Sequence, residues 1–194
     1  IYGTQGHVAY PHLSNNPINT LVSICKELKD LNLDNGNKNF QSSNLEFTSI
    51  NVDNKAHNVI PSKASAQFNI RYNNIHSSQS LKRKINLYIK RLCKKNKCNY
   101  KVQYEGSSEA FITKPNKTIL MAKRIIKKIT KINPKFSTTG GTSDARFIKK
   151  ISPCLEFGLV NKTMHKVDEC ASINDLKKLK KIYLNILSEY FLNT

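Results

Sequence analysis

The chain has 194 residues, of which 32 are Lys or Arg and 13 are Asp or Glu, so its formal net charge is +19 at pH 7. This length suits one large domain or two small ones. No apolar stretch reaches the roughly 20 residues of a membrane-spanning helix, and five cysteines without regular spacing argue against a disulfide framework. We therefore expect a cytoplasmic protein with no membrane partner.

The positive charge raises the question of a nucleic-acid partner. The lysines are scattered along the chain among many Asn and Ile residues, and the densest cluster lies at residues 82–97, on one predicted helix. Scattered charge of this kind indicates a general compositional bias. Nucleic-acid binding is therefore the less favoured interpretation, and a non-catalytic basic binding module stays open as an alternative.

The first half of the chain predicts the element order β–α–β–β–α–β. The end of a strand and a loop at residues 1–11 precede a helix that starts at Pro17, and strands are expected at 45–52, 64–72 and 99–105, with a second helix over 81–92. Every second residue from Ala64 to Tyr72 is apolar and would lie on one face of its strand. This order is the split βαβ, or ferredoxin-like, arrangement, in which two helices cover one face of an antiparallel sheet.

The second half predicts a different, α/β arrangement after a linker at 106–108. A helix is expected over 117–132, where Pro134 stops it, followed by a short strand from Phe136, a buried strand over 155–160 and a final helix whose apolar face runs from Leu176 to Tyr190. A polar loop at 161–169 carries His165.

The loop at residues 137–147, Ser-Thr-Thr-Gly-Gly-Thr-Ser-Asp-Ala-Arg-Phe, has the composition of a binding loop. Paired glycines allow a ligand to approach the backbone closely. Hydroxyls and free N–H groups can hold an anionic or carbonyl oxygen, especially if Ser143 begins a helix. Arg146 adds a planar fork that suits a carboxylate. The same composition also fits a plain surface loop with a helix cap.

Three segments together carry a resemblance: Gln5 to His12, Ser137 to Phe147, and Met164 to Cys170. The short runs 58–61 and 68–72 fit the same pattern. In order and spacing the chain resembles the di-zinc aminoacylase/carboxypeptidase family of metallopeptidases and, within it, the bacterial succinyl-diaminopimelate desuccinylases. The resemblance covers the whole chain. Because the chain opens on Ile-Tyr-Gly without Met, as though inside a strand, we expect a C-terminal fragment.

The resemblance implies two domains and a dimer. Residues 1–108 would be the lid and dimerisation domain, with its start truncated, and residues 109–194 would be the C-terminal portion of the zinc-hydrolase catalytic domain. The partners implied are a second copy of the chain, bound through the lid, and a small-molecule substrate, N-succinyl-diaminopimelate.

The resemblance also implies roles for individual residues. His165 would be a zinc ligand, for which a neutral imidazole is suited. His7 would reach into the other subunit's active site and hydrogen-bond the oxygen that becomes negative when water attacks the amide. The substrate-binding residues implied are Tyr10, Asn58, Arg71, Ser107, Gly141, Thr142 and Arg146, with the two arginines on substrate carboxylates.

The full-length subunit would hold two Zn²⁺ or Co²⁺ ions, but the chain departs from the family pattern here. The other metal ligands and the catalytic glutamate of the family have no match in this sequence, and His165 alone cannot hold two metals. We therefore expect the chain by itself to bind zinc poorly and to turn over no substrate. Smaller departures are Asp168, where the family often has Asn, and Ser108, where it often has Gly.

The function implied for the full-length protein is hydrolysis of N-succinyl-LL-2,6-diaminopimelate to succinate and LL-diaminopimelate, in lysine and diaminopimelate biosynthesis. One alternative lies in the same family: a metal-dependent deacylase or carboxypeptidase acting on another acidic N-acyl amino acid. The others are the basic binding module and a dimerisation module whose catalytic half has been lost.

Overall fold

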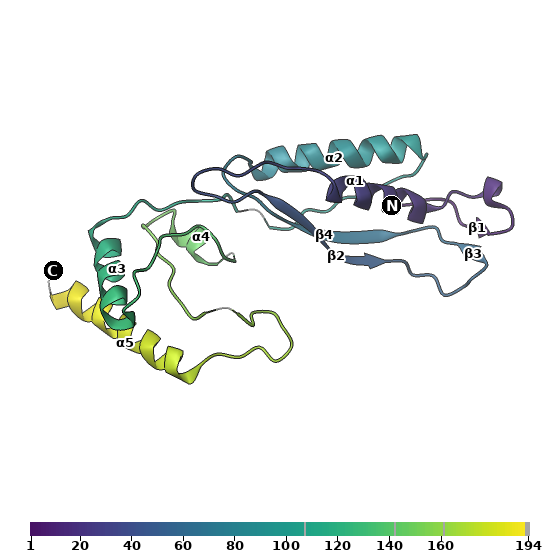
Figure 1. Ribbon diagram of the computed structural model, residues 1–194. Helices are drawn as coiled ribbons and strands as arrows, with labels where there is room; N and C mark the ends of the chain where they lie inside the picture. The colour runs from purple at the N-terminus through teal and green to yellow at the C-terminus, as the bar shows by residue number, and fades with distance from the viewer. Residues whose placement is uncertain (107, 142, 161, 193–194) are drawn as a thin grey trace. The chain divides into compact units, whose positions relative to one another are not determined.

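The computed structural model describes residues 1–106, 108–141, 143–160 and 162–192 (Figure 1). The chain divides into two compact units, unit 1 with residues 1–110 and unit 2 with residues 111–194. Unit 1 contains β1 (Gly6–His7), the 3₁₀ turn η1 (Pro11–Leu13), α1 (Pro17–Lys29), β2 (Asn44–Asn51), β3 (Val59–Ile60), β4 (Ser65–Arg71) and α2 (Ser78–Lys95). Unit 2 contains α3 (Lys117–Thr130), α4 (Ala145–Ile148) and α5 (Ile173–Leu192).

The centre of unit 1 is the antiparallel pair β2 and β4. Phe47 lies opposite Phe68 in this pair, with ring centroids 5.5 Å apart. The register shifts between Phe47 and Ser49, as at a β-bulge. The shift changes which face the following side chains occupy, and it explains why the predicted strand 45–52 has no clean polar and apolar faces.

Both helices of unit 1 cover the same face of this sheet, as the sequence predicts (Figure 1). The sheet contributes Leu45, with Phe47, Phe68, Ile70 and Tyr72 packed against the cluster. The helix residues in this buried cluster are Ile24 and Leu28 of α1 and Leu81, Ile85, Ile89, Leu92 and Cys93 of α2. Their spacing of three or four residues gives each helix one apolar stripe. The predicted apolar face of β4 is therefore confirmed.

The backbone pairings keep the order expected of a split βαβ sheet. Tyr2 forms antiparallel bridges with Lys63, just before β4, and with Asn99, after α2. The N–H of Tyr2 donates to the Asn99 carbonyl at 2.8 Å, and the N–H of Asn99 returns the bond at 3.0 Å. The first segment of the chain thus lies between the third and the last, the order that the β–α–β–β–α–β prediction requires.

The predicted strand at 99–105 is wrong beyond its first residue, because the rest of the segment is irregular. A strand needs a neighbour along its whole length, and within the described residues only Tyr2 bridges to it. The segment instead binds helix α2. The Tyr104 hydroxyl donates to the Lys82 carbonyl at 3.3 Å, and the Lys82 ammonium lies 5.4 Å from the Tyr104 ring.

In unit 2, helices α3 and α5 pack against each other. The buried residues of α3 are Ile119, Ala122, Ile125 and Ile126, whereas Ile129 is only half-buried. On α5 only Ile182 is buried, at 2% exposure, among the described residues. The rest of the predicted apolar face of α5 is exposed or half-buried.

Two predicted strands of unit 2 are wrong. Residues from Phe136 on and residues 155–160 form no strand in the described part of the chain. The Tyr183 hydroxyl of helix α5 donates to the Phe157 carbonyl of the second segment at 2.5 Å. Its apolar composition is that of a buried strand, but no strand of the described residues lies beside it, so its backbone has no ladder to join.

Candidate functional site

Three of the predicted site residues come together at one corner of unit 1, which we call the His7 corner: His7, Tyr10 and Asn58. Strand β1 pairs with β3, so that His7 lies opposite Val59, and the N–H of Val8 donates to the Asn58 carbonyl at 3.1 Å. The ring centroids of His7 and Tyr10 are 5.8 Å apart. All three side chains are exposed, so the corner presents an imidazole, a phenol and an amide to solvent.

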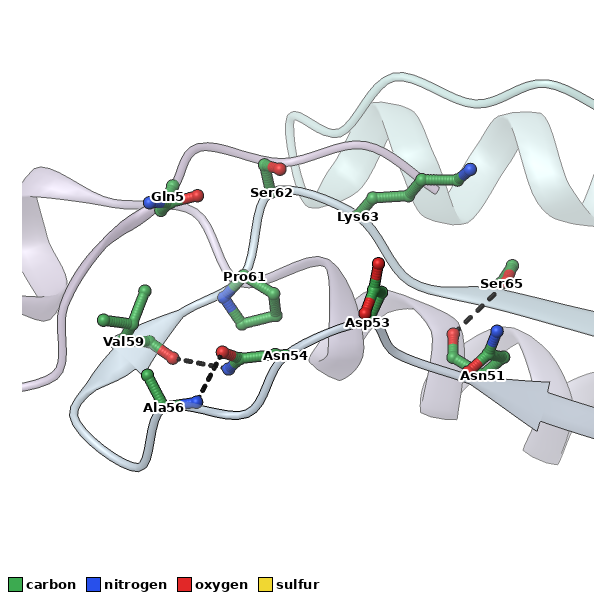
Figure 2. A pocket seen from close by; sticks show the side chains of 10 residues that line it. All are labelled: Gln5, Asn51, Asp53, Asn54, Ala56, Val59, Pro61, Ser62, Lys63 and Ser65. Atoms are coloured by element: carbon green, nitrogen blue, oxygen red, sulfur yellow. Dashed lines mark hydrogen bonds between the residues drawn. The ribbon is translucent and has the colours of Figure 1, made fainter.

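The loop that carries Asn58 is held by an asparagine that the sequence gives no reason to single out. Asn54 donates from Nδ2 to the Val59 carbonyl at 2.9 Å and accepts the Ala56 N–H at 3.1 Å (Figure 2). Such side-chain bonds to nearby backbone fix the shape of a turn. Local bonds within the loop thus fix the shape of the turn that carries Asn58.

Beside this loop lies a hollow of about 490 Å³ (Figure 2). None of the predicted site residues lines it. Its lining residues are Gln5, Asn51, Asp53, Asn54, Ala56, Val59, Pro61, Ser62, Lys63 and Ser65. The lining is mainly polar and mostly exposed, with one carboxylate and one ammonium group. The lining residues share no motif in the sequence. They come from the segment before β1, the end of β2, the β2–β3 loop, β3 and the connection into β4.

Arg71 does not belong to the His7 corner. It is exposed and occupies the last position of β4, opposite Asn44. Strand β4 starts at Ser65, so its two ends are about 20 Å apart at the usual rise per residue. The structure therefore separates Arg71 from His7, although both lie in unit 1.

In unit 2, Arg146 is the second residue of the short helix α4. The Ser143 hydroxyl accepts the Ala145 N–H at 3.1 Å, but α4 itself starts at Ala145, with Asp144 and not Ser143 as its N-cap. The Arg146 guanidinium lies 4.6 Å from the centroid of the Phe147 ring. Its Nε is buried and has no hydrogen-bond partner among the described residues. A buried N–H without an acceptor is costly, so this side chain is suited to receive an anionic oxygen.

The other predicted residues of this region are less informative. Gly141 is exposed, and a Cβ at this position would meet no atom within 4 Å among the described residues. Its backbone is therefore open to a ligand, but close packing in this unit does not require a glycine there. Ser107 and Thr142 lie outside the described residues.

His165 stands in a loop with an unusual backbone. Both His165 and Asp168 have φ of +59°, in the left-handed region, which costs a non-glycine residue about 1 kcal/mol or more. The loop is closed at its ends, because the Thr163 hydroxyl donates to the Cys170 carbonyl at 2.9 Å and accepts the Cys170 N–H at 3.1 Å. The His165 N–H donates to a Glu169 carboxylate oxygen at 3.2 Å. This closure holds the imidazole at an exposed position.

Comparison with known protein families gives a direct match for the first half of the chain. The family described as the peptidase dimerisation domain matches residues 1–97. The chain belongs to this family. Membership agrees with the split βαβ order of unit 1 and with the resemblance read from the sequence.

Curated relatives extend the peptidase dimerisation domain match over nearly the whole chain. A protein of Pelagibacter ubique named succinyl-diaminopimelate desuccinylase is 62% identical over 191 residues, which are 98% of this chain and 50% of the relative. A protein of the same name from Rickettsia bellii is 48% identical over 189 residues, 97% of this chain and 48% of the relative. The chain therefore spans about half the length of the curated relatives that it matches.

Solved structures share the fold at low sequence identity. A tripeptidase from Staphylococcus aureus has a TM-score of 0.75 at 16% identity, over 95% of this chain and 48% of the other. A di-peptidase from Saccharomyces cerevisiae has a TM-score of 0.74 at 17% identity, over 97% of this chain and 53% of the other. An M20 family metallo-carboxypeptidase from Sulfolobus solfataricus has a TM-score of 0.69 at 16% identity, over 98% of this chain and 59% of the other.

The metal that such relatives imply does not fit the described residues of this peptidase dimerisation domain protein by themselves. Over the described ranges, no three His, Cys, Asp or Glu side chains gather where they could hold an ion. A metal bound by His165 would need further ligands from outside this set. No helix in the described part of the chain is both long and apolar enough to cross a membrane.

Proposed function

We propose that this chain is part of a metal-dependent amidase that hydrolyses N-succinyl-LL-2,6-diaminopimelate to succinate and LL-diaminopimelate. The observation that carries the proposal is the 62% identity, over 191 residues, to a protein named succinyl-diaminopimelate desuccinylase. In the reaction water adds to the amide carbonyl carbon, the C–N bond breaks, and the leaving nitrogen takes up a proton. The enzyme works in the cytoplasm.

We divide the chain by role into residues 1–108, the lid and dimerisation domain, and residues 109–194, the C-terminal portion of the catalytic domain. The match of residues 1–97 to the peptidase dimerisation domain supports the first part. The exposure of apolar side chains in unit 2 supports the second, since Leu184 and Leu187 of α5 are 54% and 52% exposed. Apolar surface of this kind marks a face that packs against a partner, here the rest of the catalytic domain.

The lid pairs two copies of the protein, and each active site takes His7 from the other subunit. There His7 donates a hydrogen bond to the carbonyl oxygen as it becomes negative, with Tyr10 and Asn58 beside it. The closeness of these three residues in unit 1 supports a shared task.

The substrate carries several carboxylates, and the chain offers two arginines for them. Arg146 binds one carboxylate, which its buried and unpartnered Nε supports. Arg71 binds a second one, from the end of β4. Gly141, Thr142 and Ser107 line the same site with backbone and hydroxyl groups.

His165 is a ligand of the Zn²⁺ or Co²⁺ pair that the full-length subunit binds. When bound, the metal supplies an activated water and polarises the amide carbonyl. The closed 163–170 loop, with the His165 N–H fixed on Glu169, supports a ligand held in a set orientation.

The test is substitution of His7 in the full-length protein. His7→Ala should lower kcat for N-succinyl-diaminopimelate about 10²- to 10³-fold, the usual effect of removing one oxyanion donor, with a small change in KM. The matched control is His57→Ala, which removes an exposed histidine from the β2–β3 loop and should leave kcat within about twofold. Loss of activity in both variants, or in neither, would contradict the role of His7.

A substrate panel tests the identity of the acyl group. Full-length protein should have a kcat/KM for N-succinyl-diaminopimelate at least about 10²-fold above that for N-acetyl amino acids, because a site built to pair carboxylates leaves charged groups unpaired with a neutral acyl chain. The reverse preference would favour the related deacylase.

A further inference from the structure

The loop that begins with β1 is closed on itself by backbone hydrogen bonds. The N–H of Tyr10 donates to the His7 carbonyl at 2.9 Å, and the N–H of Ser14 donates to the Pro11 carbonyl at 3.2 Å. A Cβ on Gly6 would lie 2.6 Å from the Cβ of Ser14, so the two ends of the loop touch. The backbone around His7 is therefore set by the loop itself.

The closed loop also places a donor against the His7 ring. The N–H of Ala9 points at Nδ1 of His7, with a nitrogen–nitrogen distance of 3.1 Å. In a neutral imidazole one ring nitrogen carries the proton and the other is an acceptor. Because Nδ1 accepts the Ala9 N–H, the proton lies on Nε2. Among the described residues, Nε2 makes no hydrogen bond.

The donor and acceptor positions on this ring are the opposite of those in a histidine that acts as a base. In a Ser-His-Asp triad the Nδ1–H donates to a carboxylate, which leaves Nε2 bare to take a proton. Here the group at Nδ1 is itself a donor, so Nε2 of the neutral ring can give a hydrogen bond but cannot accept one.

We infer that the backbone N–H of Ala9 is a positioning group that holds neutral His7 as its Nε2–H tautomer, so that His7 presents a hydrogen-bond donor and not a base. The use of this donor in catalysis rests on the proposed function, because a developing oxyanion requires a hydrogen-bond donor. The tautomer itself is a property of the loop and is measurable without substrate.

The experiment reads the tautomer by NMR in full-length protein labelled with ¹⁵N-histidine, at a pH where the ring is neutral. His7→Gln identifies the signals of His7. Long-range ¹H–¹⁵N correlations should show a protonated Nε2 and an unprotonated Nδ1. A protonated Nδ1 in the unaltered protein would overturn the inference, and this result does not depend on the folding of any other variant.

Two substitutions at position 9 separate the amide from the side chain. Ala9→Gly keeps the N–H and should leave the His7 signals unchanged, whereas Ala9→Pro removes it and should produce both tautomers. If Ala9→Pro leaves a single Nε2–H tautomer, the Ala9 amide is not the positioning group, and the inference fails.

Activity links the tautomer to the reaction. The amide NH₂ of Gln reaches the place of Nε2, whereas the shorter Asn offers its groups near Nδ1, so His7→Gln should keep about tenfold more kcat than His7→Asn if an Nε2 donor is needed. If both variants lose kcat equally while NMR shows the expected proton on Nε2, the inferred tautomer is confirmed and only its use in the reaction is contradicted. If NMR shows the proton on Nδ1 but His7→Ala still lowers kcat strongly, the inferred tautomer is wrong and the proposed role of His7 stands.

Discussion

At the scale of single residues, the Asp34 carboxylate of unit 1 is held by several hydrogen bonds. Its side chain is 6% exposed and lies 3.2 Å from Nε2 of His76. It accepts hydrogen bonds from the Asn73 amide and from the N–H of Gly36, both at 2.7 Å. Burial acts to raise the pKa of Asp34, but the hydrogen bonds from Ser43, Asn73 and Gly36 outweigh it and lower the pKa to about 2.

This lowered pKa predicts where the loop at residues 34–43 becomes sensitive to acid. A carboxyl whose pKa falls on folding contributes stability above its unfolded value near 4, and the contribution is lost as the pH falls toward 2. For Asp34 the contribution above pH 4 is about 2 kcal/mol. Hydrogen exchange at the Gly36 and Ser43 amides should therefore accelerate between pH 4 and pH 2, after correction for the intrinsic rate.

The matched variants are Asp34→Asn and Asp53→Asn. The first should give fast exchange at Gly36 and Ser43 already at pH 6 and remove the acid dependence. The second changes an exposed carboxylate in another loop and should leave both amides protected. Equal protection in the two variants would show that Asp34 does not hold this loop.

At the scale of elements, the close approach of the two ends of the loop from Gly6 to Ser14 depends on a glycine. A methyl group at Gly6 would overlap the Cβ of Ser14, and such overpacking costs about 1–3 kcal/mol. Gly6→Ala should therefore weaken the β1–β3 pairing, with faster exchange of the Val8 amide that bonds Asn58. Gly158→Ala is the control, because a Cβ there meets nothing within 4 Å among the described residues.

Exchange of Val8 that is equally slow in both glycine variants would contradict the tight closure of the loop. Faster exchange in Gly6→Ala alone would confirm it. A parallel fall in kcat would then connect the closure to the presentation of His7.

Local pattern predicts those elements whose partners lie nearby in the chain. The apolar stripe of α2 and the alternation of β4 depend on residue spacing, and both form in the structure. On α1, by contrast, Ile24 is buried and Val22 is 57% exposed, a difference that spacing alone does not predict. The segments 99–105 and 155–160 have strand composition as well, but a strand also needs a neighbouring strand, which composition does not report. Within the described residues neither has one along its length, and each is irregular.

The same distinction applies to the candidate site. His7 and Tyr10 are three residues apart, so the sequence alone can expect them to be close. Asn58 joins them only through the register of β1 on β3, which is a long-range pairing that no local pattern fixes. Arg71 pairs with Asn44 at the other end of β4, and this strand pairing is also long-range. The residues that line the hollow beside Asn54 form no motif in the sequence.

At the scale of the whole molecule, the proposed function requires two subunits to share each active site. In the proposed division His7 belongs to the lid and His165 to the catalytic portion. A subunit that lacks His7 should then be complemented by a subunit that lacks His165. A heterodimer of His7→Ala and His165→Ala subunits has one site with both histidines. Random subunit exchange makes about half of the dimers heterodimers.

The most direct measurement is therefore the activity of a mixture. Full-length His7→Ala and His165→Ala proteins, each nearly inactive alone, are combined in equal amounts and allowed to exchange subunits. A site shared between subunits predicts recovery of about a quarter of the unaltered activity. A control mixture of His165→Ala with the double variant should recover none. If the first mixture also stays inactive although heterodimers form, His7 does not act across the dimer, and the central proposal is wrong.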